Sequence, residues 1–412
     1  SDVELAIFTN DGKALANKTV EIVQKSHSFL FGDQLWELDR FHRYGMQNTD
    51  RAFYFKERFK EVFNAANALC YWTEHPRNDG PKIEDIQGRN VTEHFEYCVD
   101  WACSQQLAVK GHPLFWSIEK CVPKWVMSYD FPTRMKFAEV RVRNLVALFR
   151  NRIKLWDAVN EALWEPVFKN LDKRHWPHIE KNSDMADMIG EVLQWCKSEN
   201  PDAKFLVNDY GLEEDPDSGP PKTKDGMPVS AALQRERYVE LFIELKKRGL
   251  APDAIGLQSH LGKGWISLKK QTEVFDEISK AEIPMHVTEF WAHTNHLEET
   301  GKLTKDQIEQ MQSDYACNIL KIAFGHPGID AFFFWEFMND SIKWDDYSGH
   351  IPKPLFYSVK NLINKEWRTN AKFATDKNGI IKFRAFHGTY SLRLKQGKLP
   401  NGIEFSVNKQ FK

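Results

Sequence analysis

The sequence predicts an α/β protein built as a (β/α)8 TIM barrel, with a small β-sandwich-like module formed by its N- and C-terminal strands. Two observations predict the barrel. Eight short apolar runs recur at roughly 30–50 residue intervals, and helical periodicity follows each of them. Alternating strands and helices are typical of a parallel sheet, and eight units favour a closed barrel over an open sheet. A third observation, alternating apolar residues beside turn signals at both ends of the chain, predicts the module.

The barrel is expected to occupy residues 29–368. No GxGxxG or GxxxxGK[ST] motif follows any of its apolar runs, which removes the main support for nucleotide binding. Amphipathic segments follow the runs, for example Phe137–Arg150 and Lys305–Phe324. The eight expected strands are Phe29–Gly32, Ala65–Leu69, Ala108–His112, Leu155–Asn160, Phe205–Asn208, Ala254–Gln258, Met285–Glu289 and Ala331–Trp335.

Both ends of the chain carry strand signals. Thr19–Val23 alternates within residues 1–28. Within residues 369–412, Gly388–Leu394 reads as a strand, and the turn signal Asn378-Gly379 precedes a further apolar segment, Ile380–Phe383. Neither end has enough strands to bury a core by itself. We therefore expect the two ends to form one accessory β-module. The alternative is that each end packs separately on the barrel.

Composition excludes several classes of protein. The 412 residues are 42% hydrophobic and 28% charged, as in a folded globular chain. Lys+Arg number 56 against 58 Asp+Glu, so charge gives no reason to expect nucleic acid or a membrane surface as a partner. None of the six cysteines forms a Cys-x-x-Cys pair, and we expect no metal and no cofactor. The chain begins without a basic and apolar leader, so it is either cytoplasmic or has lost a signal peptide.

Polar residues gather at the carboxyl ends of the expected strands, which share one face of a parallel barrel. A single such residue has an ordinary explanation, because strand-end polar groups often cap the next helix. Six strands of eight with this feature indicate an active site instead. These strand-end residues are His112, Asn160, Glu161, Asn208, Asp209, Gln258, His260, Glu289, Trp335 and Glu336.

Glu161 and Glu289 are the candidate catalytic pair. They end the fourth and seventh expected strands, which lie across the lumen of an eight-stranded barrel. Two carboxyl groups about 5–5.5 Å apart are what retaining glycoside hydrolysis needs, one protonated as the acid and one ionised as the nucleophile. Asn160, beside Glu161, is placed to hold a sugar hydroxyl.

Several segments resemble glycoside hydrolase family 10, the xylanase family. Trp156–Ala162 is similar to its acid/base motif, and Val287-Thr288-Glu289 to its nucleophile motif. Gly111–Trp116 and Gly256–Leu261 are similar to two further motifs, and Asn208-Asp209-Tyr210, Trp335 and Lys353-Pro354 follow in the expected order. The resemblance spans roughly residues 29–367 and implies a (β/α)8 barrel with a retaining mechanism.

The resemblance also implies roles for individual residues. Glu161 would be the acid/base, Glu289 the nucleophile, and His260 would orient Glu289. It implies no metal site. The implied substrate-binding residues are Asn64, His112, Trp116, Asn160, Tyr210, Gln258, His260 and Trp335.

The sequence departs from the family on the side of the sugars at the non-reducing end. The family's Glu, Asn and Lys after the second strand are absent, because the chain continues as Asn67–Thr73. Ser117 and Phe290 replace a usual His and Asp. We hypothesise that Tyr71, Trp72 and Glu74 form a replacement surface.

We therefore expect a retaining β-glycanase that hydrolyses β-1,4-linked plant polysaccharide or oligosaccharide, similar to an endo-β-1,4-xylanase. The alternatives are a retaining β-glucosidase or cellobiohydrolase on the same barrel, or a non-catalytic carbohydrate-binding barrel. We expect a monomer whose partner is the polysaccharide or oligosaccharide substrate. We expect it to be secreted or periplasmic, with a cytoplasmic protein as the alternative.

Overall fold

A computed structural model describes residues 1–73, 80–85, 87–118, 121–163, 182–215, 222, 226, 228–261, 264–345, 349–394 and 403–408. The chain divides into two compact units. One unit combines Ser1–Leu30 with Tyr357–Lys412, and the other is Phe31–Phe356. All six cysteines are free thiols. Among the described helices, none combines the length and the apolar composition needed to cross a membrane.

The larger unit is the predicted (β/α)8 barrel, and each of the eight expected runs forms one of its strands. The described strands pair in parallel in chain order, and pairing between the first and last of them closes the ring. Short strands β6 (Phe115–Trp116) and β10 (His260–Leu261) extend the pairing of two barrel strands. The barrel strands are β3 (Leu30–Gln34), β4 (Ala65–Leu69), β5 (Ala108–His112), β7 (Leu155–Asn160), β8 (Lys204–Asp209), β9 (Ala254–Leu257), β11 (Met285–Ala292) and β12 (Ile329–Phe334).

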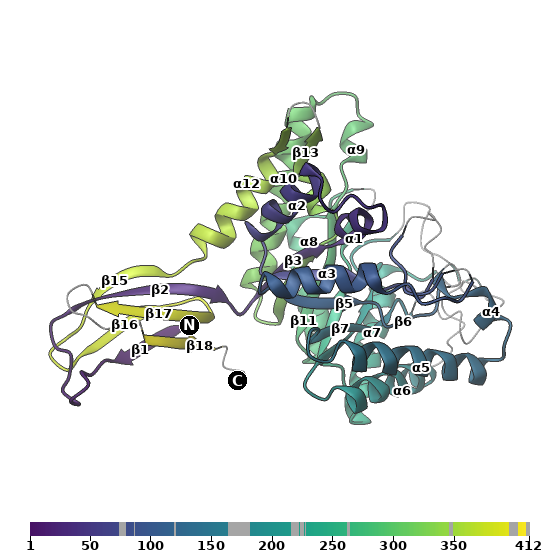
Figure 1. The fold of residues 1–412 in the computed structure, drawn as a ribbon, viewed down its shortest axis with the longest axis horizontal. Coiled ribbons are helices and arrows are strands. Elements are labelled where there is room, and N and C mark those ends of the chain that lie inside the picture. The colour runs from purple at the N-terminus through teal and green to yellow at the C-terminus, as the bar shows by residue number, and fades with distance from the viewer. Residues whose placement is uncertain are drawn as a thin grey trace. The chain divides into compact units, whose positions relative to one another are not determined.

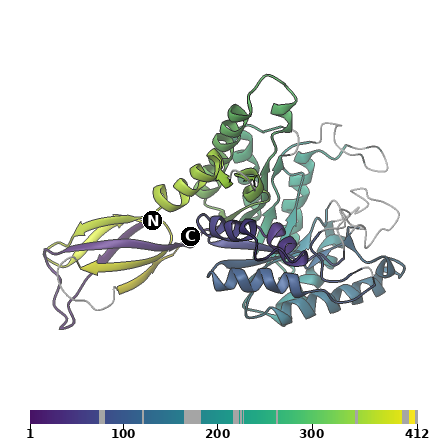
Figure 2. The same cartoon turned by 45° about the horizontal axis from the view of Figure 1, so that its top comes forward.

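Helices surround the strands, and successive helices pack side by side, α5 on α6, α6 on α7 and α7 on α8 (Figures 1 and 2). Several begin at a Ser, Thr or Asp whose side chain accepts a backbone N–H of the first turn, as Asp130 does for α5 and Ser230 for α7. The helices are α1 (Trp36–Arg43), α2 (Asp50–Lys60), α3 (Glu93–Ser104), α4 (Lys124–Met127), α5 (Phe131–Leu148), α6 (Asn182–Glu199), α7 (Ala231–Lys247), α8 (Leu268–Ile278), α9 (Asn295–Glu298), α10 (Lys305–Gly325), α11 (Phe337–Asp340) and α12 (Pro354–Asn361). A hairpin of β13 (Ile342–Asp345) and β14 (Gly349–Pro352) follows α11.

The smaller unit contains antiparallel sheets made from both ends of the chain, as predicted. In one sheet β1 (Asp2–Ala6) pairs with β16 (Ile380–Arg384). The other has the order β15 (Asn370–Ala374), β2 (Thr19–His27), β17 (Gly388–Leu394) and β18 (Ile403–Val407). One apolar cluster draws side chains from both sheets: Ile7, Val20, Ile22, Ile381, Phe383, Tyr390 and Leu392.

The compact units divide the chain at a different point from the expected barrel limit of residue 368. Residues 357–368, which include the π-helical turn Leu362–Glu366, group with the terminal strands. His27 Nε2 lies 3.1 Å from the carbonyl oxygen of Ile363, and Arg368 donates to the carbonyl oxygen of Lys25 over 3.1 Å. These hydrogen bonds attach the segment to β2.

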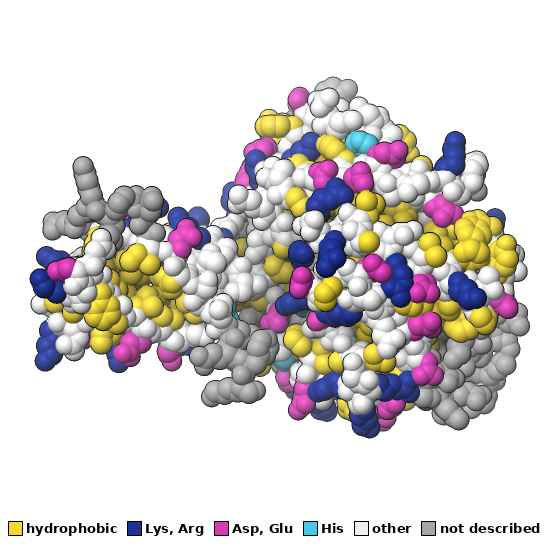
Figure 3. Space-filling model, turned by 60° about the horizontal axis from the view of Figure 1, so that its bottom comes forward, with side chains coloured by type: hydrophobic (Ala, Val, Ile, Leu, Met, Phe, Trp, Pro, Cys, Tyr) yellow, Lys and Arg dark blue, Asp and Glu magenta, His cyan; other side chains and the backbone are white. Residues whose placement is uncertain are grey.

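Charged side chains of both signs are interspersed over the face of the barrel seen in Figure 3. This mixture agrees with the nearly balanced charge of the whole sequence.

Candidate active site

Glu161 and Glu289 both lie at the carboxyl ends of barrel strands, and both are buried, with 8% and 3% of their surface exposed. A β-bulge lies close to each of them. The pairing of β7 with β8 shifts register between Asp157 and Val159, and that of β11 with β12 shifts between Val287 and Phe290. A bulge bends its strand and redirects the side chains that follow, which brings both carboxyl groups toward the site.

Both carboxyl oxygens of Glu289 face hydrogen-bonding groups. Oε1 accepts the side-chain amide of Asn208 over 2.8 Å, and Oε2 lies 3.0 Å from Nε2 of His260. Nδ1 of His112 lies 3.8 Å from Oε1. Burial raises the pKa of Glu289, but attraction to His112 and the hydrogen bond and charge of His260 outweigh it, so the pKa falls below its usual 4.5. These contacts favour the ionised carboxylate that a nucleophile requires.

Glu161 has a different environment. Its Oε1 accepts the side-chain amide of Gln258 over 2.9 Å, and its Oε2 accepts the indole N–H of Trp116 over 2.7 Å. Its backbone has φ of 56°, in the left-handed region that non-glycine residues rarely adopt. The backbone N–H donates to the carbonyl oxygen of Asn208 over 2.8 Å. A strained backbone that several hydrogen bonds hold is common at functional sites.

Asn208 connects the two halves of the site. Its side-chain amide donates to Asn160 Oδ1 and to Glu289 Oε1, both over 2.8 Å, and its Oδ1 accepts the hydroxyl of Thr288 over 2.6 Å. A Cβ on Gly256 would lie 2.4 Å from Asn208 Oδ1, so the close approach of β8 and β9 requires a glycine there. Because Asn160 Oδ1 accepts from Asn208, the side chain of Asn160 is fixed in orientation, and its NH₂ group remains to donate elsewhere.

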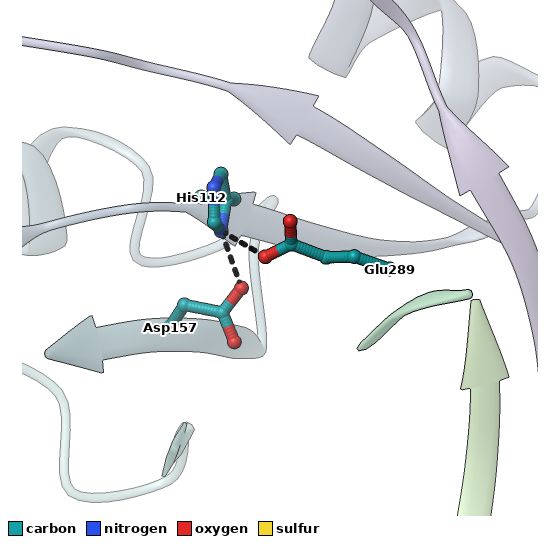
Figure 4. Close-up of side chains that lie close together, drawn as sticks. All are labelled: His112, Asp157 and Glu289. Atoms are coloured by element: carbon teal, nitrogen blue, oxygen red, sulfur yellow. Dashed lines mark hydrogen bonds and ion pairs between the residues drawn. The ribbon is translucent and has the colours of Figure 1, made fainter. Parts of the chain in front are cut away.

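His112 lies between two carboxylates, Asp157 and Glu289 (Figure 4). Asp157 Oδ2 is 2.7 Å from His112 Nδ1 and 2.7 Å from the ammonium of the fully buried Lys110. Burial raises the pKa of Asp157, but attraction to Lys110 and the contact with His112 outweigh it and lower the pKa to about 2. One potential ligand atom from each of His112, Asp157 and Glu289 lies within 4.8 Å of the others, a spacing that could suit a metal ion. The ammonium of Lys110 already pairs with Asp157, however, and so occupies the place of a cation there.

Most of the predicted site residues meet around this network. Trp335, which follows β12, places its ring centroid 5.6 Å from that of His112 and 5.8 Å from that of His260. Tyr210 follows β8 at the same end of the barrel and is half-buried. The residues joined by the contacts above are His112, Trp116, Asn160, Glu161, Gln258, His260, Glu289 and Trp335.

The predicted substrate-binding role of Asn64 does not agree with its position. It immediately precedes β4, at the amino end of that strand and at the opposite end of the barrel from the site. Its Oδ1 accepts the backbone N–H of Phe31 over 2.8 Å, which ties β3 to β4. The sequence motif placed Asn64 near a strand, but the direction of that strand separates it from the carboxyl ends, where the other predicted site residues lie.

Sequence reasoning missed Lys110 and Asp157, and it counted Asn208 only as a strand-end polar residue. The sequence did contain a signal for Lys110 and Asp157. Each is an ionisable residue inside an apolar run, and the two runs form neighbouring strands. Of the hypothesised replacement surface, Tyr71 is buried with its ring centroid 5.4 Å from that of Trp116 and 6.0 Å from that of His112. Glu74 lies outside the described residues.

Comparison with known proteins gives consistent matches. The family model of glycosyl hydrolase family 10 matches residues 80–366. The anti-sigma-I factor RsgI6 of Acetivibrio thermocellus is 24% identical over 402 residues, 95% of this chain and 44% of that protein. Endo-1,4-beta-xylanase 2 of Arabidopsis thaliana is 22% identical over 409 residues, 97% of this chain and 33% of that protein. The chain thus spans less than half the length of these two relatives.

Solved structures share the fold. The crystal structure of xylanase 10B from Thermotoga petrophila RKU-1 in complex with xylobiose matches with a TM-score of 0.58 and 19% identity. The match covers 82% of this chain and 95% of that chain. It confirms the barrel architecture.

Proposed function

Because the chain belongs to glycosyl hydrolase family 10, we propose that it is a retaining β-glycanase acting on β-1,4-linked plant polysaccharide or oligosaccharide, similar to an endo-1,4-β-xylanase. The chain is homologous to endo-1,4-β-xylanases. The observation that carries the proposal is the pair of buried carboxyl groups in unlike environments, Glu289 beside two histidines and Glu161 between an amide and an indole. Retaining hydrolysis needs two carboxyl groups in different roles, and the two glutamates have different partners.

The first chemical step forms a glycosyl-enzyme. The ionised carboxylate of Glu289 attacks the anomeric carbon while the carboxyl of Glu161 donates its proton to the glycosidic oxygen, so that the carbon–oxygen bond breaks and the shortened glycan leaves. His260 and Asn208 hold the Glu289 carboxylate in one orientation. In the second step Glu161 takes a proton from water, whose oxygen attacks the same carbon and releases Glu289.

The sugar at the cleavage point lies among polar groups that the network has fixed. The Asn160 amide and the ring of His112 are available to sugar hydroxyls, because the Asn160 carbonyl oxygen and the His112 Nδ1 are already engaged. Trp335 offers a half-buried aromatic face beside both histidines. Because a plant polysaccharide lies outside cells, we also propose that the protein is secreted or periplasmic. We further propose that it acts as a monomer.

Two alternatives remain open to experiment. A retaining β-glucosidase or cellobiohydrolase would use the same pair, and the replaced residues after the second strand keep it in consideration. A carbohydrate-binding barrel without catalysis is the other, and a relative named as an anti-sigma-I factor gives it a reason. The retention of both glutamates in one hydrogen-bonded network supports catalysis over binding alone.

The test is the release of aryl alcohol from chromogenic xyloside, xylobioside and glucoside substrates. We expect the xylobioside to be the best substrate, and the anomer first formed to keep the β configuration by NMR. Glu289→Ala should lower turnover by a factor on the order of 10⁴ without changing the melting temperature by more than a few degrees. Turnover of Glu289→Ala within tenfold of the parent would exclude it as the nucleophile, and no turnover by the parent on any of the three substrates would favour the binding alternative.

A further inference from the structure

One carboxylate outside the catalytic network orients two tryptophans. Glu84 Oε2 accepts the indole N–H of Trp72 over 3.0 Å, and Glu84 Oε1 accepts the indole N–H of Trp125 over 2.9 Å. Each indole N–H thus donates to a different oxygen of the same carboxyl group. The two indole rings are therefore held in defined orientations.

Trp125 presents much of its ring to solvent. It belongs to the short helix α4 and is 41% exposed, whereas Trp72 is only 9% exposed. The rings of Trp125 and Phe137 pack nearly perpendicular to each other with centroids 4.8 Å apart, so Phe137 supports Trp125 from α5. A large apolar ring that is both supported and exposed is typical of a binding surface more than of a core.

Trp72 is anchored on its other side by a buried cation. The guanidinium of Arg141 lies 5.5 Å from the centre of the Trp72 ring, and it donates to the carbonyl oxygens of Leu114 and Pro113 over 3.1 and 3.2 Å. Burial lowers the pKa of Arg141 to about 10, so the side chain stays charged at neutral pH. Arg141 therefore fixes the loop that carries Trp72 to the loop after β5.

These tryptophans are continuous with the candidate active site. Trp72 directly follows Tyr71, whose ring packs against those of Trp116 and His112. Trp116 in turn donates to the carboxyl of Glu161. Trp72 is thus linked to the site by its place next to Tyr71 in the chain, and to Trp125 by the carboxyl of Glu84 that both indoles share.

We propose that Trp125, oriented by Glu84, is an outer subsite that binds a pyranose ring of the glycan chain away from the cleavage point. Sugar rings present faces of C–H groups that pack on an exposed indole, and a ring fixed beforehand loses little entropy on binding. The proposal rests on the proposed function for its ligand class, a β-1,4-linked glycan. It also supplies an aromatic contact on the side where the family's polar residues are absent.

The test measures binding, so that it does not depend on turnover. In a Glu289→Gln background, calorimetry with xylobiose and xylohexaose should show that Trp125→Ala lowers the affinity for xylohexaose about tenfold relative to its effect on xylobiose. Tyr129→Ala is the matched control, because Tyr129 is also an exposed aromatic residue packed on Phe137 but donates to no carboxylate in the described contacts. We expect it to leave both affinities within twofold.

Trp125→Tyr should recover most of the affinity for xylohexaose, because it keeps an aromatic face. An equal loss for both oligosaccharides in Trp125→Ala, or a Trp125→Tyr variant as weak as Trp125→Ala, would overturn the subsite. Failure of the parent to bind xylohexaose and cellohexaose would overturn it as well. A parent that binds xylohexaose through Trp125 but hydrolyses nothing would support the subsite while rejecting the hydrolase.

Discussion

The hydroxyl of Ser259 donates to the buried carboxyl of Glu213 over 2.6 Å, and this contact anchors the segment that touches the carboxyl groups of both Glu161 and Glu289. The residue before Ser259 donates to Glu161, and the residue after it contacts Glu289. Ser259 itself has φ of 56°, a conformation that costs free energy for a non-glycine residue. Glu213 therefore helps to hold a strained turn on which both halves of the proposed mechanism would depend.

Ser259→Ala should lower kcat about fivefold while KM changes less than threefold, because one hydrogen bond that positions the turn is worth about 1 kcal/mol. Steady-state kinetics on an aryl xylobioside measures both constants. Ser341→Ala is the control, since its buried hydroxyl has no hydrogen-bond partner among the described residues. If both variants lose the same thermal stability and neither loses kcat, Ser259 has no positioning role.

Glu161→Ala should lower kcat/KM on natural glycosides about 10³-fold, because the leaving oxygen then receives no proton. The loss should be much smaller for a dinitrophenyl glycoside, whose leaving group needs no proton, and azide should accelerate its second step by replacing water. Equal losses on the two kinds of substrate would contradict the assignment of Glu161 as the acid.

The low pKa of Glu289 sets the acid side of the activity profile. The nucleophile must be ionised, and the contacts with His112 and His260 keep its pKa below 4.5 in the folded protein. Activity should therefore be retained to lower pH than an ordinary glutamate nucleophile would allow, and it should be lost as the pH falls through the lowered pKa and the carboxylate takes up a proton. His260→Gln weakens that stabilisation and should move the acid limb of kcat/KM to higher pH. An unchanged limb would show that another group controls it.

Removing residues 369–412 should unfold the terminal sheets. β1 pairs with β16, and β2 pairs with β15 and β17, so the deletion removes their described strand partners. We expect aggregation and rapid proteolysis of residues 1–28, because unpaired strand edges associate with one another. The control is Lys382→Ala, which removes only an exposed ion pair with Glu4 and should change little. A soluble truncated protein whose first 28 residues resist protease would show that the two ends are independent.

The sequence by itself determined the barrel strands and the candidate pair Glu161 and Glu289. Hydrophobic periodicity depends on local chemistry, so runs such as Ala108–His112 could be assigned from neighbouring residues alone. Parallel strands all present their carboxyl ends on one face, which is why Glu161 and Glu289 could be paired across 128 positions of sequence. The two-ended β-module followed in the same way, from counting strands against what a core requires.

Only the tertiary structure decided which side chains touch. In the sequence, nothing indicates that Lys110 and Asp157 form an ion pair; the register of β5 and β7 brings their charged atoms to 2.7 Å. Asn208 contacts both Asn160 and Glu289 only because the barrel brings their strands together. Asn64 shows the converse, since a motif residue lies at the wrong end of its strand. The local pattern of residues determines which segments form strands. Contacts between strands depend on register, bulges and barrel closure, which are fixed by the packing of the whole barrel.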